Sequence, residues 1–171
     1  MERHLDERFA LRVPKLSRWL FKLAFLLTAD SPVRRRVVKR LTTRGFEALA
    51  REDDAVVLLL IDADYELHVI GEGFRALGFA ERYHGHEGWC EFIGLWRSQW
   101  TEVRYAIELL IDRGDGLIGR VTAIARGASS GAEVRQTAGY VWHFDRGAVV
   151  SQDFYWDWSE CAAAVGPDND T

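Results

Sequence analysis

Residues 134–156 read VRQTAGYVWHFDRGAVVSQDFYW, and they contain the clearest structural signal in the chain. Two alternating runs, 134–144 and 148–156, flank Asp145-Arg146-Gly147, a turn sequence in which glycine supplies a positive φ. Because successive side chains of a strand point to opposite faces, one face of each run is largely aromatic. The pattern predicts an antiparallel hairpin with an aromatic inner face.

Three earlier runs alternate in a similar way and predict strands over 64–70, 103–112 and 117–126. In the first of them, an apolar face alternates with a polar face that holds Glu66 and His68. Glycine-containing turns separate the later strands, as antiparallel hairpins require.

Helical periodicity precedes and interrupts these strands. Pro32 follows a capping Ser31 and predicts a helix over 32–51, and a second, short helix capped by Asp53 and Asp54 is expected to run through Leu60. Trp89, Ile93, Trp96 and Trp100 recur at spacings of four, three and four, so they share one face of a third helix. A last helix is expected over 159–165, and residues 71–85 are expected to form a long, glycine-containing connection.

The chain of 171 residues has the length of one domain. The order of elements predicts the α+β class, with a strongly curved antiparallel sheet wrapped around helices. We expect an N-terminal helical extension over 1–31, the domain over 32–166 and a disordered tail over 167–171.

The extension contains an apolar segment, residues 19–29, which Lys22 interrupts and which is shorter than the roughly 20 residues of a membrane span. We therefore expect no membrane span but an amphipathic helix that covers the domain or a partner subunit. Attachment to a membrane surface is an alternative. It would use the side chains of Arg18, Trp19, Phe21, Lys22 and Phe25.

Composition argues against several classes of function. The 22 Lys and Arg are outnumbered by 26 Asp and Glu, so the chain lacks the basic footprint of a nucleic-acid binder. Cys90 and Cys161 are isolated, which favours reduced thiols and a cytoplasmic location. The sequence contains no phosphate-binding loop or nucleophile elbow, and no cofactor is expected. His84 and His86 lie in glycine-rich flanks that favour a flexible loop, so no metal site is expected either.

The predicted inner faces suggest a ligand pocket. If both late strands point inward, their rings join the aromatic helix around an apolar space with Tyr140 and Gln152 as polar groups. We therefore predict an apolar small-molecule ligand; a filled aromatic core is the competing interpretation. The predicted ligand-binding residues are Trp96, Trp100, Trp142, Gln152, Phe154 and Trp156.

His68 is the strongest candidate for a general base, with Glu66 as a group that could orient it. A surface or structural histidine is the simpler interpretation. Carboxylates at Glu108, Asp112, Asp153 and Asp157 are further candidates without a diagnostic spacing.

Gly85-His86-Glu87-Gly88 before the aromatic helix, and Phe144-Asp145-Arg146-Gly147 before the last strand, resemble the SnoaL-like branch of the nuclear transport factor 2-like superfamily. The resemblance covers about residues 33–166. It implies a cone-shaped fold with three helices packed into a bent sheet, commonly a homodimer through the outer face of the sheet. The N-terminal helix lies outside the resemblance.

That superfamily includes polyketide cyclases, ketosteroid isomerase and limonene epoxide hydrolase, as well as binding and structural proteins, so the fold does not imply one activity. Comparison with ketosteroid isomerase places Tyr140 at its proton-donating aspartic acid and Leu67 or His68 at its catalytic aspartate. Phe46 stands at its oxyanion-hole tyrosine. These differences count against steroid isomerisation.

Three hypotheses follow. In the first, an isomerase or cyclase uses His68 to remove a proton next to a carbonyl while Tyr140 stabilises the enolate; the residues of an epoxide hydrolase are harder to assemble. In the second, the pocket binds an apolar metabolite without catalysis. In the third, the chain is a dimeric structural module with a filled core. The sequence leaves open whether the chain is an enzyme.

Overall fold

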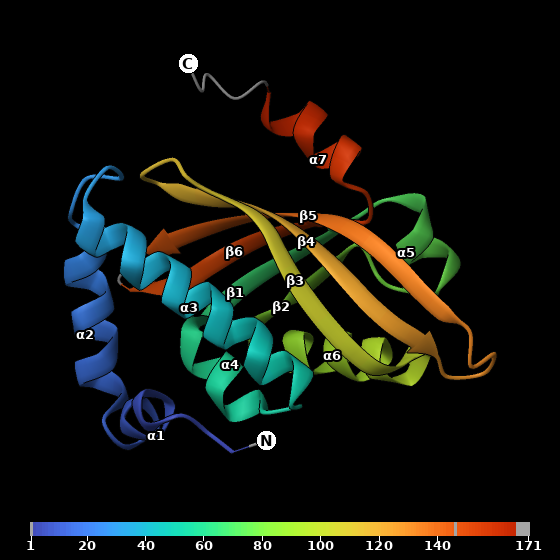
Figure 1. The fold of residues 1–171 in the computed structure, drawn as a ribbon, viewed down its shortest axis with the longest axis horizontal. Coiled ribbons are helices and arrows are strands. Elements are labelled where there is room, and N and C mark those ends of the chain that lie inside the picture. The colour runs from blue at the N-terminus through green and yellow to red at the C-terminus, as the bar shows by residue number, and fades with distance from the viewer. Residues whose placement is uncertain (1, 146, 167–171) are drawn as a thin grey trace.

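A computed structural model describes residues 2–145 and 147–166. In this part of the chain, six strands form one curved sheet, and seven helices lie around it, with helices on both of its sides (Figure 1). The helices are α1 (Leu5–Arg12), α2 (Pro14–Phe25), α3 (Pro32–Ala50), α4 (Asp54–Leu60), α5 (Glu72–Ala76), α6 (Gly85–Gln99) and α7 (Trp158–Val165). The strands are β1 (Ile61–Ile70), β2 (Arg82–His84), β3 (Trp100–Asp112), β4 (Gly116–Gly127), β5 (Glu133–Asp145) and β6 (Ala148–Tyr155).

The sheet has the strand order β2-β1-β6-β5-β4-β3. Helices α3, α4 and α6 lie along its concave side, and α7 lies on the opposite side (Figure 1). The α+β class and the curved sheet are therefore confirmed. One pair departs from the predicted antiparallel sheet: β1 and β6 are parallel, because three successive hairpins bring β6 back beside β1 in the same direction.

Two segments contain more structure than the sequence predicted. The N-terminal extension holds two helices rather than one, and Pro14 begins the second at a position where proline is favoured. The expected connection 71–85 contains α5 and the short strand β2, which pairs with β1 through Leu67 and Tyr83. The tail predicted over 167–171 lies outside the described residues.

The main core fills the concave side of the sheet. Tyr65 and Leu67 of β1, Phe74 of α5 and Val121 of β4 are almost fully buried there. A smaller cluster on the outer face joins Ile118 and Tyr155 to Cys161 of α7. The outer face is thus partly covered by the chain's own last helix.

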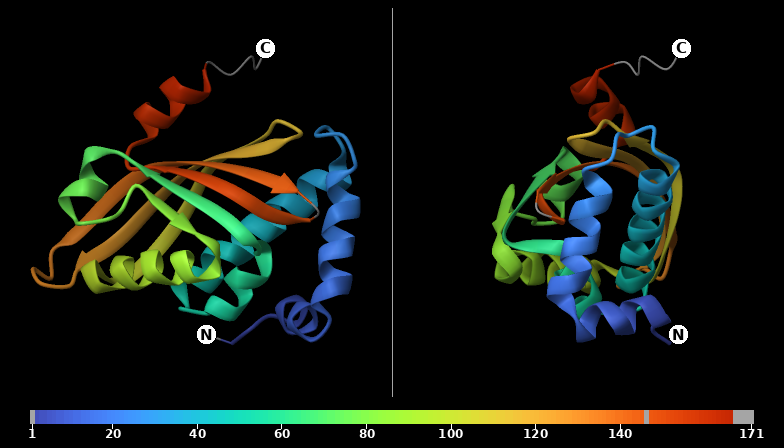
Figure 2. Two further views of the ribbon diagram at one scale, coloured as in Figure 1. Left: turned by 180° about the vertical axis from the view of Figure 1, so that it is seen from behind. Right: turned by 90° about the vertical axis from the view of Figure 1, so that its left-hand side faces the viewer.

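Helix α2 stands across one end of the molecule, beside the β5–β6 hairpin and α3 (Figure 2). Gly147 of that hairpin has φ +80° and lies so close to α2 that a Cβ there would collide with the Arg18 carbonyl oxygen. Arg18 Nη2 donates to the Ile61 carbonyl at 3.0 Å. These contacts hold α2 against the start of β1 and of β6. No helix among the described residues is long and apolar enough to cross a membrane.

Candidate functional site

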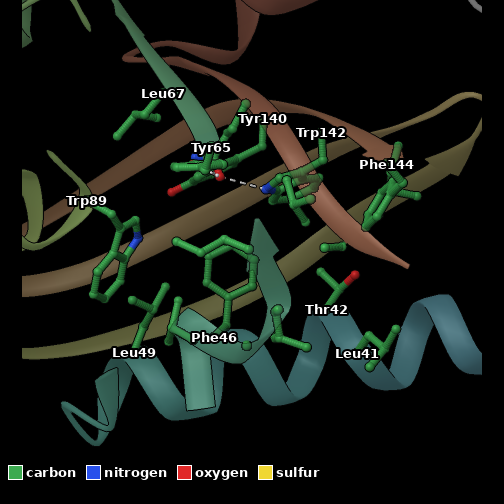
Figure 3. A pocket seen from close by; sticks show the side chains of 18 of the residues that line it. Leu41, Thr42, Phe46, Leu49, Tyr65, Leu67, Trp89, Tyr140, Trp142 and Phe144 are labelled. Carbon is green, nitrogen blue, oxygen red and sulfur yellow. Dashed lines mark hydrogen bonds between the residues drawn. The ribbon is translucent and has the colours of Figure 1, made fainter. Parts of the chain in front are cut away.

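A cavity of about 130 Å³ lies between the concave face of the sheet and helices α2, α3, α4 and α6. Phe46 rises from α3 toward Tyr140 and Trp142 of β5, and Trp89 of α6 closes another side (Figure 3). An engineered apolar cavity of about 150 Å³ stays dry and binds benzene. The space therefore matches one small ring, and the core is not completely filled.

Gln152 is the polar centre of the cavity wall. Its Oε1 accepts a hydrogen bond from the Tyr65 hydroxyl at 3.0 Å and another from Trp142 Nε1 at 2.8 Å. An indole N–H can only donate, so the amide must turn its oxygen toward Trp142. Strand β6 lies between β1 and β5, which is why one glutamine reaches a donor on each neighbouring strand.

Tyr140 contributes an unbonded hydroxyl to the cavity wall. Its ring stacks on Phe154 at 4.4 Å and on Trp142 at 5.1 Å between centroids. Among the described residues, its hydroxyl makes no hydrogen bond. Burial raises the pKa of Tyr140 well above its usual range, and the neighbouring Tyr105 and Tyr65 raise it further. The hydroxyl is therefore a neutral donor that is free for a ligand.

Trp96 and Tyr105 form a second polar corner of the cavity. Burial raises the pKa of Tyr105 to about 12, although the Trp96 indole lowers it. The two groups lie near each other without a well-aligned bond, since the buried Trp96 Nε1 has no hydrogen-bond partner among the described residues. Burial also raises the pKa of Tyr65.

None of the described residues that line the cavity is Asp, Glu, His, Lys or Arg. Its polar groups are phenols, indoles, one amide and the hydroxyl of Thr42. Such a lining offers hydrogen bonds to a neutral ligand. It offers no side chain that would act as a base near neutral pH.

The structure separates the two residues that we predicted to be catalytic. Tyr65, Leu67 and Val69 are buried on the concave side, so His68 points to the outer face of the sheet. There its Nδ1 lies 2.8 Å from Asp153 Oδ1, and its Nε2 lies 3.6 Å from Glu66. The strand alternation that buries Leu67 also turns His68 away from Tyr140. The two do not meet in one pocket.

The predicted binding residues divide into two groups. Trp96, Trp142, Gln152 and Phe154 line the cavity together with Tyr140. The other two tryptophans lie outside it: Trp100 packs against Trp96, and Trp156 covers Phe74 of α5. Trp156 follows the end of β6, which accounts for its different direction.

Sequence reasoning missed many contributors to the cavity wall, among them one tyrosine of β1 and two phenylalanines of α2. Tyr65 was assigned to an apolar face, and its neighbour on β6 could not be known from the sequence. Phe21 and Phe25 of α2 also line the cavity, and Phe25 stacks on Phe144 at 4.4 Å. Their spacing of four residues was a usable signal, but it indicated only a shared helix face.

The described residues contain one cluster with possible metal ligands, formed by His4, Glu7 and Glu47. Glu7 already pairs with Arg51 and Glu47 with Arg44. Cations at these positions oppose a bound metal ion, so the cluster fits an ion-pair network better than a metal site.

No family model and no curated protein sequence matches the chain. Solved structures do match it. An NTF2-like protein of unknown function from Burkholderia pseudomallei superposes with a TM-score of 0.63 at 22% identity, over 75% of this chain and 97% of that one. The chain has the nuclear transport factor 2-like fold.

Two further structures with this fold are similar to the chain. TerC, crystallised with polyporic acid, has a TM-score of 0.62 at 18% identity over 72% of this chain and 94% of its own. A protein assigned as a SnoaL-like polyketide cyclase from Jannaschia sp. CCS1 has a TM-score of 0.63 at 14% identity over 83% and 100%. These names agree with the resemblance seen in the sequence. At such identities, the likeness establishes the fold and no activity.

Proposed function

We propose that the chain binds a small, uncharged, largely apolar molecule that carries one hydrogen-bond acceptor. The observation that carries the proposal is the unpartnered Tyr140 hydroxyl at a ring-sized apolar cavity. A carbonyl oxygen is the simplest acceptor for it. The aromatic walls supply dispersion contacts, and the hydroxyl orients the ligand.

We propose binding without proton abstraction as the primary activity. The absence of a charged or imidazole group from the described lining supports this choice over an isomerase or cyclase. His68 would need a different arrangement of β1 to reach a ligand beside Tyr140. The polyporic acid complex of TerC concerns that protein and is only consistent with a ligand-binding use of the fold.

The test compares two probes of the same size, cyclohexanone and methylcyclohexane, on the wild-type chain and on Tyr140→Phe. If Tyr140 donates to the ketone, the wild type should prefer cyclohexanone more strongly than the variant does. A net hydrogen bond of about 1 kcal/mol corresponds to a preference that falls about fivefold in Tyr140→Phe. Ligand-detected NMR titration gives both dissociation constants.

The outcomes separate the three hypotheses. Equal preferences in the two proteins would contradict the role of Tyr140, and no binding of either probe would favour the filled core. Proton exchange at the carbons beside the ketone, followed by NMR in deuterated water, tests catalysis. Exchange that is faster with wild type than with His68→Ala would favour the enzyme over the binding protein.

A further inference from the structure

The outer surface of the N-terminal helices is unusually apolar. Every large apolar side chain that is exposed among the described residues lies between residues 5 and 33. On α2, Leu16, Trp19, Leu20 and Leu23 recur at helical spacing and are 41–54% exposed. Leu26, at the end of α2, is 72% exposed. We call these five residues the N-terminal apolar face.

This face lies opposite the side of α2 that closes the pocket. Phe21 and Phe25 point inward and line the cavity, whereas Leu16, Leu20 and Leu23 remain in contact with solvent. The helix is therefore apolar on two sides. Only one of them is used by the chain itself.

The segment that carries the apolar face is also rich in unpaired cations. Residues 1–51 hold 13 of the 22 Lys and Arg but 5 of the 26 Asp and Glu, a net charge of +8, and the rest of the chain has −12. Several of these cations are bound in ion pairs. Six others are exposed and have no ion pair among the described residues: Arg12, Lys15, Lys22, Arg35, Arg36 and Lys39.

We propose that α1, α2 and the start of α3 form a docking surface for an anionic lipid bilayer. The apolar face enters the interfacial region, with Trp19 at headgroup level, and Lys15 and Lys22 of the same helix contact the lipid phosphates. A second copy of this surface is a poorer occupant, because a symmetric contact would oppose two sets of like charges. The proposal goes beyond the proposed function and does not depend on it.

Docking has a consequence for the pocket. The same helix would contact lipid with one side and cover the cavity with the other, so a ligand dissolved in the bilayer would meet the protein at the cover of its site. The residues that would contact the membrane differ from those of the membrane alternative considered for the sequence. Phe21 and Phe25 are turned inward, and Arg18 is bonded to the Ile61 carbonyl.

The test is flotation of the full chain with vesicles. We expect the wild type to float with vesicles of phosphatidylcholine mixed with phosphatidylglycerol, and to float less with phosphatidylcholine alone and at high salt. Lys15→Gln/Lys22→Gln should bind the anionic vesicles about thirtyfold more weakly, at about 1 kcal/mol for each cation. A matched control, Arg82→Gln/Arg135→Gln, removes two exposed cations elsewhere and should bind as the wild type does.

A second variant, Leu20→Gln/Leu23→Gln, changes only exposed side chains and should lose flotation while its melting temperature is kept. The proposal is overturned if the wild type does not float with anionic vesicles, or if the two cation variants weaken binding equally. It is also overturned if light scattering shows a dimer that Leu20→Gln/Leu23→Gln dissociates while vesicles remain unbound. Cyclohexanone titration of the same samples reports the pocket separately, so failure of one proposal is distinguishable from failure of the other.

Discussion

At Gln152, a single side-chain oxygen satisfies two buried donors on neighbouring strands. Gln152→Leu would leave the Tyr65 hydroxyl and the Trp142 indole without that acceptor. Because an unsatisfied buried donor costs about 1–3 kcal/mol, we expect the free energy of unfolding to fall by about 2–4 kcal/mol. Urea denaturation followed by circular dichroism measures the change.

Tyr140→Phe is the control for this prediction, since it removes a hydroxyl that has no partner among the described residues. Its free energy of unfolding should stay within about 0.5 kcal/mol of wild type. A loss of stability as large as that of Gln152→Leu would show that the Tyr140 hydroxyl already makes a hydrogen bond within the protein.

The tyrosines of the cavity also make a prediction about pH. Burial holds the pKa of Tyr105 at about 12, and it raises those of Tyr65 and Tyr140 too. A phenol with a raised pKa stays protonated and neutral at every pH below its ordinary value of about 10. The affinity for cyclohexanone should therefore be constant between about pH 6 and about pH 9. A midpoint near neutral pH in an NMR titration series would mean that a histidine or a carboxylate meets the ligand.

Among the elements, α2 determines how large a ligand can be. Phe21 forms part of the wall between the cavity and a second apolar gap of about 290 Å³, which lies between the N-terminal helices and α3 and α4. Phe21→Ala should join the two spaces and admit a two-ring ketone. We expect 1-tetralone to bind this variant at least about fivefold more tightly than it binds wild type.

The variant should also lose about 1–3 kcal/mol of stability, because it removes a partly buried ring. Leu23→Ala, on the exposed side of the same helix and outside the lining of both spaces, is the control and should change neither quantity. Unchanged tetralone affinity in Phe21→Ala, measured by the same NMR titration, would contradict the role of α2 as the cover of the cavity.

Arg34 fixes the turn between α2 and α3. Its guanidinium donates to both Asp112 carboxylate oxygens at 2.7 Å, to the carbonyls of Phe25 and Leu27, and to Gly114. Arg34→Ala would leave the largely buried Asp112 carboxylate and three carbonyls without this donor. We expect a loss of about 3–5 kcal/mol in the free energy of unfolding by urea.

Arg36→Ala, two residues away on the same helix, is exposed and unpaired, so it should lie within about 0.5 kcal/mol of wild type. Equal effects of the two substitutions would mean that the Arg34 network does not stabilise the fold.

The sequence predicted most elements because their periodicity was strong. The helices over 32–51 and 54–60 and the five long strands appear close to the expected bounds. The short elements were missed: α5 has five residues and β2 three, which is too few for a pattern to repeat. Their formation depends on packing against β1 and Phe154, contacts that lie far apart in the sequence.

Regular alternation also determined which residues of the cavity wall could be predicted from the sequence. Alternation along β5 correctly grouped Tyr140 and Trp142, because both belong to one regular strand. In β6 the alternation breaks: the register shifts between His143 and Phe144 of β5, and Val149 lines the cavity although it lies an odd number of residues before Gln152. The side of the sheet on which His68 lies could not be predicted, because the polar face of an isolated strand carries no information about which side the helices will cover.

At the scale of the whole molecule, the sheet separates the neutral polar groups of the cavity on its concave side from charged groups on its convex side. The described residues that surround the cavity on the concave side are all neutral, and His68, Glu66 and Asp153 lie on the convex side. A homodimer through that convex side remains a prediction. It would have to include α7, or the polar strip beside it where Arg120 pairs with Glu108, because α7 already covers the apolar part.

The central claim is that a neutral ligand occupies the cavity and accepts a hydrogen bond from Tyr140. A crystal structure of the chain with cyclohexanone tests it most directly. We predict density for one ring near Phe46 and Trp142, with the ketone oxygen about 2.7 Å from the Tyr140 hydroxyl oxygen. An empty cavity in crystals that bind the ketone elsewhere, or a ring whose oxygen points away from Tyr140, would contradict the claim.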